Sequence, residues 1–215
     1  MREPLSAAAG DSRLTIAVPK GRILGPLKER FAAAGLDVGP LDGDDRRLLR
    51  DGRPSGPRYL LLKPDDVPTY VEYGAADLGV VGRDVLLERE YDLYVPVDLG
   101  IGLCRMVVAA VANRPLPDRP LRVATKFPNI AARYFLERGR PVETIFVQGS
   151  VELAPITGLA DMIVDLVESG ETLRRNGLVE LETVCSISTV VVANRVGLKL
   201  HQRRIEPLLS ALRST

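Results

Sequence analysis

The most informative stretch of the chain is residues 152–173, which read ELAPITGLADMIVDLVESGETL. An apolar strand is predicted over residues 162–164, followed by the acid Asp165 and by a small polar turn at residues 169–172 that opens a helix. The unpaired N–H groups at the start of a helix attract phosphate, and a carboxylate such as Asp165 accepts hydrogen bonds from ribose hydroxyls. This order of residues therefore suits a sugar phosphate.

The small residues of the turn admit two interpretations. As a ligand site, Gly170 lets the backbone approach a phosphate closely, and the hydroxyls of Ser169 and Thr172 add hydrogen-bond donors. As a purely structural feature, the same turn is a helix start with Ser169 as its N-cap. Because such turns are common, the stretch alone leaves the two interpretations about even.

Short apolar runs alternate with helical patterns on both sides of this stretch, which predicts an α/β chain with mostly parallel strands. The predicted strands cover residues 14–18, 46–49, 59–62, 76–81, 95–100, 103–112, 121–125, 142–146, 162–164 and 178–193. The predicted helices cover residues 24–34, 83–89, 128–138 and 198–212, with further helices starting near 66, 152 and 169. The pattern restarts near residue 103, which indicates a second lobe, and residues 1–12 are expected to be a flexible tail.

Composition narrows the class of protein. The chain has 215 residues, of which 46% are hydrophobic and 27% charged, as in ordinary soluble globular proteins. A net charge of +1 argues against a protein that binds nucleic acid or anionic membranes by bulk charge, although it allows a local anion site. No signal peptide or run of transmembrane length is evident, so we expect a cytoplasmic protein.

Few residues suit nucleophilic or metal chemistry. Cys104 and Cys185 lie far apart in apolar segments and are expected to be free thiols. His201 is the only histidine and has no evident partner for a triad or a metal site. The sequence therefore predicts no resident protein metal site and no Ser/His/Asp or Cys/His arrangement.

Two basic clusters are candidate anion sites. Lys20, Gly21 and Arg22 follow the first strand directly, where open α/β sheets bind ligands, and the two cations suit a phosphate or pyrophosphate. Arg46 and Arg47 lie on a predicted strand, so only one of them can face a given ligand. In both cases an exposed, solvated basic segment is the structural alternative.

A third region, residues 66–82, reads DVPTYVEYGAADLGVVG and predicts a helix packed on a strand. Gly79 and Gly82 are expected to allow close packing there. Asp66, Tyr70 and, just beyond, Asp84 are possible ligand contacts.

Four motifs, in this order, resemble the ATP phosphoribosyltransferase family. They are residues 17–22 (AVPKGR), 66–82, 122–130 (RVATKFPNI) and 152–173, and the resemblance spans residues 13–213. It implies an α/β, two-lobed periplasmic-binding-protein-like fold of type II, with the active site in the cleft between the lobes. Residues 13–102 and 186–215 would form lobe I, and residues 103–185 would form lobe II, which binds phosphoribosyl pyrophosphate.

The resemblance also implies an activity. The enzyme would transfer the phosphoribosyl group of phosphoribosyl pyrophosphate to N1 of the adenine of ATP, giving phosphoribosyl-ATP and pyrophosphate, the first step of histidine biosynthesis. Mg²⁺ would be carried by the pyrophosphate. The length matches the short-form catalytic subunit, which forms a homodimer and works with a histidyl-tRNA-synthetase-like regulatory subunit. The alternatives are a non-catalytic two-lobed binding or sensing domain and a phosphoribosyltransferase that uses another base.

By resemblance, roles extend to individual residues. Arg22 and Arg46 would contact the substrate phosphates and the leaving pyrophosphate, with help from Lys20. The ribose and 5-phosphate would be held by Asp165, Glu168, Ser169, Gly170, Glu171 and Thr172. The ATP contacts would include Gly21, Arg47, Tyr70 and Asp84. Two positions depart from the usual patterns: Asp45-Arg46-Arg47 stands where the family has Ser-Arg-Lys, and Leu166 stands where many other phosphoribosyltransferases have a second acid.

Overall fold

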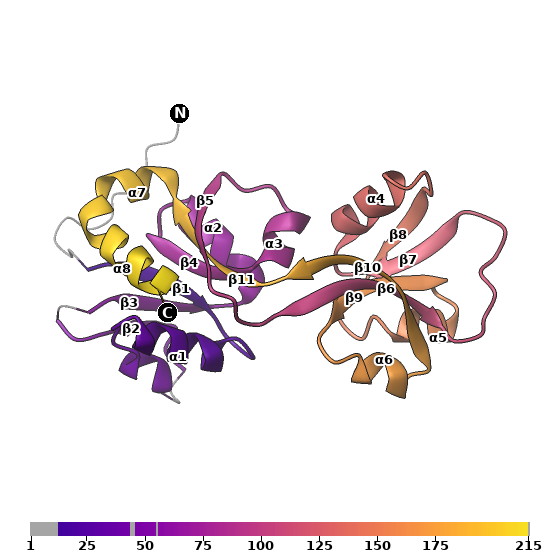
Figure 1. The fold of residues 1–215 in the computed structure, drawn as a ribbon, viewed down its shortest axis with the longest axis horizontal. Helices are drawn as coiled ribbons and strands as arrows, with labels where there is room; N and C mark the ends of the chain where they lie inside the picture. Colours follow the sequence, from indigo (N-terminus) through magenta and orange to yellow (C-terminus); the bar gives the residue numbers. More distant parts are fainter. Residues whose placement is uncertain (1–12, 44–45, 55, 215) are drawn as a thin grey trace. The chain divides into compact units, whose positions relative to one another are not determined.

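The computed structural model describes residues 13–43, 46–54 and 56–214 (Figure 1). The predicted tail, residues 1–12, lies outside this part. The chain divides into two compact units: unit 1 contains the residues up to Leu86, Glu90–Gly102 and those from Ser188 onward, and unit 2 contains Leu87–Arg89 and Leu103–Ile187. The chain thus leaves unit 1 after Gly102 and returns to it at Ser188. These units differ from the predicted lobes at two places. Residues 186 and 187 belong to unit 2, because its last strand continues to Ile187, and Leu87–Arg89, predicted in lobe I, also belong to unit 2.

Unit 1 is built on a six-stranded sheet with the order β2-β3-β1-β4-β11-β5. Its strands are β1 (Thr15–Pro19), β2 (Leu49–Asp51), β3 (Arg58–Leu62), β4 (Leu78–Gly82), β5 (Leu93–Asp98) and β11 (Thr189–Asn194). Its helices are α1 (Leu24–Ala33), α2 (Val67–Glu72), α3 (Arg83–Glu88, which ends in unit 2), α7 (Arg195–Leu200) and α8 (Gln202–Ser214), with short 3₁₀ turns at Gly39–Asp42 and Pro64–Asp66.

Unit 2 is built on a five-stranded sheet with the order β10-β6-β9-β7-β8. Its strands are β6 (Cys104–Val111), β7 (Leu121–Thr125), β8 (Val142–Phe146), β9 (Met162–Val167) and β10 (Leu178–Ile187). Its helices are α4 (Pro128–Leu136), α5 (Leu153–Thr157) and α6 (Glu171–Arg175).

Both units have three layers, because alternate residues of each central strand face opposite cores. In unit 2, Met106 and Val108 of β6 pack on the side of α4, whereas Val107 and Ala109 pack on the side of α5 and α6. Figure 1 shows α4 along one face of this sheet and α5 and α6 along the other. In unit 1, α1 and α8 cover one face and α2 and α3 cover the other.

The α/β class is confirmed, but the expectation of mostly parallel strands is wrong. In unit 1, β1 pairs in parallel with β3 and β4, whereas β11 runs antiparallel to both β4 and β5. In unit 2, β7 pairs in parallel with β8 and β9, whereas β6 runs antiparallel to β9 and β10. Both sheets are mixed, because in each one the strand that follows a chain crossing, β6 in unit 2 and β11 in unit 1, runs antiparallel to both of its neighbours. In unit 1 the edge strand β2 is also antiparallel to β3.

Three predicted elements also need correction. The strand predicted over residues 46–49 begins only at Leu49, because residues 46–48 form an irregular bend. The single run predicted over residues 178–193 breaks at Ser188 into β10 and β11, which belong to different sheets. The helix predicted over residues 198–212 is two helices, α7 and α8, broken at His201, where the backbone leaves helical geometry (φ −110°, ψ 17°).

Candidate active site

Asp165 lies at the carboxyl end of two parallel strands of unit 2. The last residue of β7 that pairs with β9 is Thr125, opposite Val164. Asp165 follows Val164, one residue beyond the end of β7, while β6 still covers it on the other side through Val107. Ligands of open α/β sheets bind at such strand ends, so the strand order gives this carboxylate a position where it can meet a ligand.

The surroundings of Asp165 disfavour its charge. Burial raises the pKa of the carboxyl above its ordinary value, and the nearby carboxylate of Glu152 raises it further. The N–H of Leu166 donates to Asp165 Oδ1 at 2.8 Å, and this bond and the charge of Lys126 lower the pKa in part. A partly buried carboxylate with a perturbed pKa at a strand end is typical of a binding site rather than of a structural ion pair.

Lys126 and Glu152 were missed as site residues by the sequence interpretation. Lys126 directly follows β7 and Glu152 directly precedes α5, so both come from segments that end near Asp165. The available signal was their place inside two of the four motifs, residues 122–130 and 152–173. Their charge at Asp165 depends on contacts between distant segments, which residue spacing does not report.

The turn after β9 corrects the predicted cap. Gly170, not Ser169, is the N-cap of α6. The Ser169 hydroxyl instead accepts a hydrogen bond from the N–H of Glu171 at 3.3 Å. Glu168, Ser169 and Thr172 are exposed, and Glu171 is exposed in an ion pair with Arg175. Because α6 has only five residues, the turn itself, and not a long helix dipole, must supply the donors for an anion.

The conformation of the turn itself also requires a glycine at position 170. Its φ is +74°, and a Cβ added to it would lie 2.9 Å from Glu180 Oε1 and 3.1 Å from Arg174 Nη1. That side of the residue is thus covered by protein. Glu180 is held in turn by both oxygens on Arg105 (3.0 and 2.9 Å), and Arg174 Nη1 donates to the Ser169 carbonyl at 3.0 Å. Arg174, and Arg105 through Glu180, thus hold the backbone of the turn in place.

Lys20, Gly21 and Arg22 form an exposed loop at the carboxyl end of β1 in unit 1. The N–H of Lys20 donates to the carbonyl of Leu62 at the end of the parallel strand β3, at 2.8 Å. The carbonyl of Gly21 accepts from the N–H of Leu24 at 3.0 Å, which closes the turn into α1. The space beside Gly21 is open, since no atom lies within 4 Å of the position of an added Cβ. The loop therefore presents its two cations and an accessible backbone.

Arg46 and Arg47 lie in the bend before β2, both exposed. The Arg47 carbonyl accepts a hydrogen bond from Arg50 Nε at 3.0 Å, which closes the bend. The argument that strand alternation turns only one of the two side chains toward a ligand is therefore wrong, because neither residue is in a strand. Asp45, the neighbouring acid, lies outside the described residues.

The region of residues 66–84 is partly structural. A Cβ on Gly79 would lie 2.6 Å from Val71 Cγ2, so α2 packs tightly on β4 as predicted. At Gly82 the space is taken by the carboxylate of Asp84, 2.1 Å from the position of a Cβ. Tyr70 on α2 is 42% exposed. Asp66 precedes α2 without a side-chain capping bond. Tyr70 and Asp66 are thus accessible, whereas Asp84 folds back on its own backbone.

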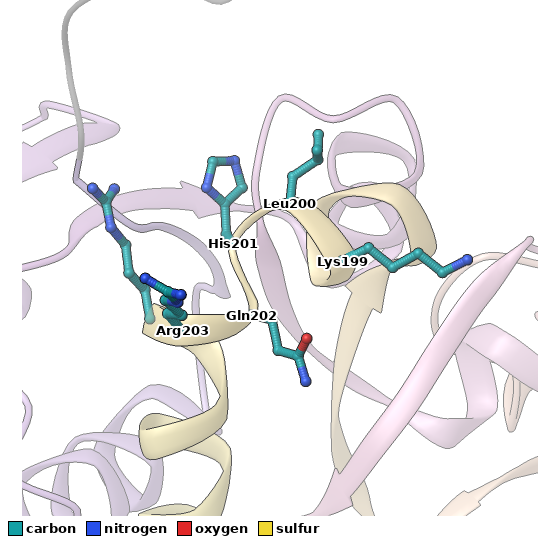
Figure 2. Close-up of a pocket in the computed structure, with 6 residues that line it drawn as sticks. Lys199, Leu200, His201, Gln202 and Arg203 are labelled. Carbon is teal, nitrogen blue, oxygen red and sulfur yellow. The ribbon is translucent and has the colours of Figure 1, made fainter.

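A basic hollow of about 540 Å³ lies at the junction of α7 and α8. It is lined by Lys199, Leu200, His201, Gln202, Arg203 and Arg204. Figure 2 shows His201 and Leu200 pointing to one side of the junction and Gln202 to the other, so these side chains do not converge on one point. His201 Nε2 lies 3.8 Å from Asp77 Oδ1, a partner that the sequence did not indicate. The hollow therefore lacks the convergent groups of a ligand site.

The cysteines, the possible metal-binding groups and the lengths of the helices also bear on the chemistry. Cys104 and Cys185 are not joined in a disulfide, as predicted, and both are only partly buried. Within residues 13–43, 46–54 and 56–214, no group of three or more His, Cys, Asp or Glu side chains is arranged to hold a metal ion. No helix in that same part of the chain is long and apolar enough to cross a membrane.

Comparisons with known proteins agree on one family. The family model for ATP phosphoribosyltransferase matches residues 63–214. A protein of Sorangium cellulosum called ATP phosphoribosyltransferase is 58% identical over 201 residues, which cover 94% of this chain and 95% of that protein. ATP phosphoribosyltransferase 2 of Geobacter sulfurreducens is 48% identical over 204 residues, with 93% and 96% covered. A solved structure described as the ATP phosphoribosyl transferase (HisG:HisZ) complex from Thermotoga maritima matches with a TM-score of 0.81 and 37% identity, covering 94% of this chain and 96% of that one.

Proposed function

Since the chain belongs to the ATP phosphoribosyltransferase family and is a pentosyltransferase of the first step of histidine biosynthesis, we propose that unit 2 binds phosphoribosyl pyrophosphate and that unit 1 supplies cations for its pyrophosphate. The observation that carries this assignment is the position of Asp165. Its partly buried carboxylate lies in β9 just beyond the carboxyl end of β7, two residues before the end of β9 and the turn that carries two exposed hydroxyls.

The sugar is held by the segment from Asp165 to Thr172. Asp165 accepts hydrogen bonds from the ribose hydroxyls, and these bonds favour its charged form against the cost of burial. The backbone N–H groups of the turn and the hydroxyls of Ser169 and Thr172 donate to the 5-phosphate. Lys126 adds a positive charge on the same side of the sheet. Glu168 and Glu171 are acidic and exposed, so their contribution is to the orientation of the ribose rather than to the phosphate.

The leaving pyrophosphate is neutralised by Arg22 and Arg46, with help from Lys20. Guanidinium groups bind phosphate oxygens through paired N–H donors, and their charge matters most when the pyrophosphate leaves. Gly21, Arg47, Tyr70 and Asp84 are assigned to ATP. Of these, the exposed Tyr70 has the accessible aromatic face that an adenine ring can stack on.

The reaction exchanges one bond at C1 of the ribose. The lone pair of adenine N1 forms the N–C bond, while the C–O bond to the pyrophosphate breaks and its electron pair leaves with the pyrophosphate. Alignment of the two substrates and charge neutralisation supply the catalysis, so the chain needs no nucleophile of its own. Magnesium enters with the pyrophosphate group of the substrate, because Mg²⁺ binds phosphate oxygens while keeping several waters.

The assembly extends beyond this chain. The Thermotoga maritima structure is a HisG:HisZ complex, and this supports a hetero-oligomer with a regulatory subunit of that kind here. A homodimer of the catalytic chain and a cytoplasmic location, where ATP is available, are further parts of the proposal. The periplasmic-binding-protein-like fold of type II and its cleft stay a prediction.

Two alanine variants test the proposal. R22A and R46A should each lower the rate of phosphoribosyl-ATP formation by a factor corresponding to about 2–4 kcal/mol, because each removes a donor that acts on the leaving group. Circular dichroism checks that the variants are folded, and the assays are run with and without the regulatory subunit. Wild-type turnover in both folded variants would refute the leaving-group role.

The alternative functions make different predictions. A non-catalytic binding or sensing domain would bind the substrates without turnover, and the names of the relatives give it no support. A transferase for another base would form its product from a free base and phosphoribosyl pyrophosphate. Absorbance assays with ATP and with free bases separate these cases.

A further inference from the structure

Ile23 joins the basic loop of unit 1 to the two segments through which the chain leaves and rejoins that unit. It follows Arg22 directly and is the N-cap residue of α1. A Cβ added to Gly102, the last residue before the chain passes to unit 2, would lie only 2.3 Å from Ile23 Cδ1. The same Cβ would lie 2.9 Å from Thr189 Oγ1. The tip of Ile23 is thus seated where Gly102 lacks a side chain.

The surface under Ile23 is held by hydrogen bonds within unit 1. The N–H of Thr189 donates to the Ile101 carbonyl at 3.1 Å, and the Thr189 carbonyl accepts from the N–H of Leu99 at 2.9 Å. Asp98 accepts from the Ser188 hydroxyl at 2.7 Å, which adds a side-chain bond between the outgoing and returning segments. Thr189 is 2% exposed. Ile23 therefore rests on a hydrogen-bonded stretch of backbone in which Thr189 is buried.

The basic loop has one anchor on each side. Before the turn, the N–H of Lys20 is bound to the Leu62 carbonyl at the end of β3. After the turn, the Ile23 side chain is held by the segments at Gly102 and Thr189. Because neighbouring Cα atoms are about 3.8 Å apart and joined by a planar peptide, a shift of the Ile23 backbone also moves the backbone of Arg22.

We propose that Ile23 and Gly102 are positioning residues that set the place of Arg22 from the conformation of the outgoing and returning segments. This inference rests on the leaving-group role assigned to Arg22 above. A misplacement of about 1 Å in a positioned group can lower the rate about 100-fold. Displacement of Ile23 by a single methyl group at position 102 can therefore have a measurable effect on kcat.

Two glycines of the outgoing segment provide a matched comparison. Gly100 and Gly102 have nearly the same strained backbone, with φ of +64° and +61°. An added Cβ meets nothing within 4 Å at Gly100, whereas at Gly102 it meets Ile23. G100A therefore measures the backbone strain of alanine alone, and G102A measures the same strain together with displacement of Ile23 and a close contact with Thr189 Oγ1.

A methyl exchange tests whether Ile23 transmits the effect. In the double variant I23V/G102A, valine lacks the Cδ1 atom, and the new Cβ at position 102 would lie 3.7 Å from the Ile23 Cγ1 position that valine keeps, an ordinary contact distance. The four proteins G100A, G102A, I23V and I23V/G102A are compared as full chains, with and without the regulatory subunit. The readouts are kcat, KM for phosphoribosyl pyrophosphate, product inhibition by pyrophosphate, and Tm.

We expect G102A to have a kcat about 10- to 100-fold below that of G100A, with pyrophosphate inhibition weakened in parallel, at temperatures well below Tm. I23V/G102A should recover the part of this loss that comes from Ile23 and have a kcat well above that of G102A, while the contact of the new Cβ with Thr189 Oγ1 at 2.9 Å remains. A G102A variant that matches G100A in kcat, or a folded double variant no better than G102A, would overturn the proposal. If G102A does not fold, I23A decides: it removes the contact without backbone strain, and wild-type kcat in folded I23A would equally overturn it.

The result is separable from the test of function. Wild-type turnover in R22A removes the role of Arg22, whatever the glycine variants do. Loss of turnover in R22A, together with equal kcat in G100A and G102A, leaves the proposed function intact and rejects only the positioning contact.

Discussion

The two units carry their candidate site residues in opposite ways. In unit 2, Asp165 is partly buried at a strand end, and the following turn is fixed by Glu180 and Arg174 around a covered glycine. In unit 1, Lys20, Arg22 and Arg46 are all exposed on loops. The preformed site of unit 2 suits a stable sugar phosphate. Charge that develops as the pyrophosphate leaves is stabilised by preorganised donors, so the exposed cations of unit 1 depend on the anchors of their loops.

The largest expected effect tests whether recognition of the sugar belongs to unit 2. D165N should weaken binding of phosphoribosyl pyrophosphate about 10- to 100-fold, because hydrogen bonds to a charged group contribute about 1.5–3 kcal/mol. Titration calorimetry measures the affinity. Equal affinity for phosphoribosyl pyrophosphate in D165N and wild type would show that the buried carboxylate is not a sugar ligand, and the contrast between the two units would not hold.

The same variant should gain stability at neutral pH. The pKa of Asp165 is raised, so its charged form is disfavoured in the folded state, and stability is lost as pH rises through that pKa. D165N removes this cost, so its Tm should exceed that of wild type at pH 7, and the difference should shrink toward pH 3. A lower Tm for D165N at pH 7 would contradict this sign.

Variants of Gly170 and Gly177 test whether the turn at residues 169–172 is rigid. G170A should lower the free energy of unfolding by about 2 kcal/mol, because alanine at positive φ costs about 1–2 kcal/mol and its Cβ also displaces Glu180. G177A is the control, since Gly177 has a similar φ of +71° with open space around it. Urea unfolding measures both. Equal losses of unfolding free energy in G170A and G177A would mean that Glu180 and Arg174 move away from the new Cβ at little energetic cost.

The acid sensitivity of unit 2 gives a smaller effect. Burial acts to raise the pKa of Asp161, but the bonds from Arg119 (both 2.8 Å) and from the N–H of Arg122 (2.8 Å) outweigh it and hold the pKa below its ordinary value. The stability that Asp161 contributes is therefore present above the ordinary Asp pKa and is lost as pH falls.

D161N should accordingly cost about 1–2 kcal/mol at pH 7 and less at pH 3, as measured by urea unfolding at both pH values. The exposed Asp118, which precedes Arg119 in the chain, serves as the control through D118N. A loss for D161N that does not depend on pH would indicate packing rather than charge.

The smallest effect concerns unit 1. The hydroxyl of Tyr59, a fully buried residue, donates to the Asp37 carbonyl at 2.8 Å. Y59F should cost about 1 kcal/mol in the free energy of unfolding and leave turnover unchanged, because this contact anchors the segment after α1 and not the basic loop. Y73F, at a residue 83% exposed, should change neither quantity. A large loss of turnover in Y59F would contradict this expectation, because it would show that the basic loops of unit 1 depend on the packing of its core.

The sequence predicted correctly those helices and strands whose pattern depends only on neighbouring residues. The strands β7 and β8 and the start of α4 lie where periodicity and Pro128 place them. It failed at Ser188 and His201, where a continuous apolar or helical pattern is broken by backbone geometry. Apolar content does not record such a break, because Ser188 turns out of the strand to bond Asp98, ninety residues earlier in the chain.

The sequence by itself determined the chemistry of this protein: the acid, the glycine and the hydroxyls of the turn, the cations after the first strand, and the family that their order indicates. The tertiary structure alone decided the setting of those groups. It raised the pKa of Asp165, covered Gly170 with Glu180 and Arg174, and seated Ile23 on Gly102. The physical reason is that residue types and short-range spacing fix what a group can bind, whereas burial, charge environment and steric contact depend on residues that only folding brings together.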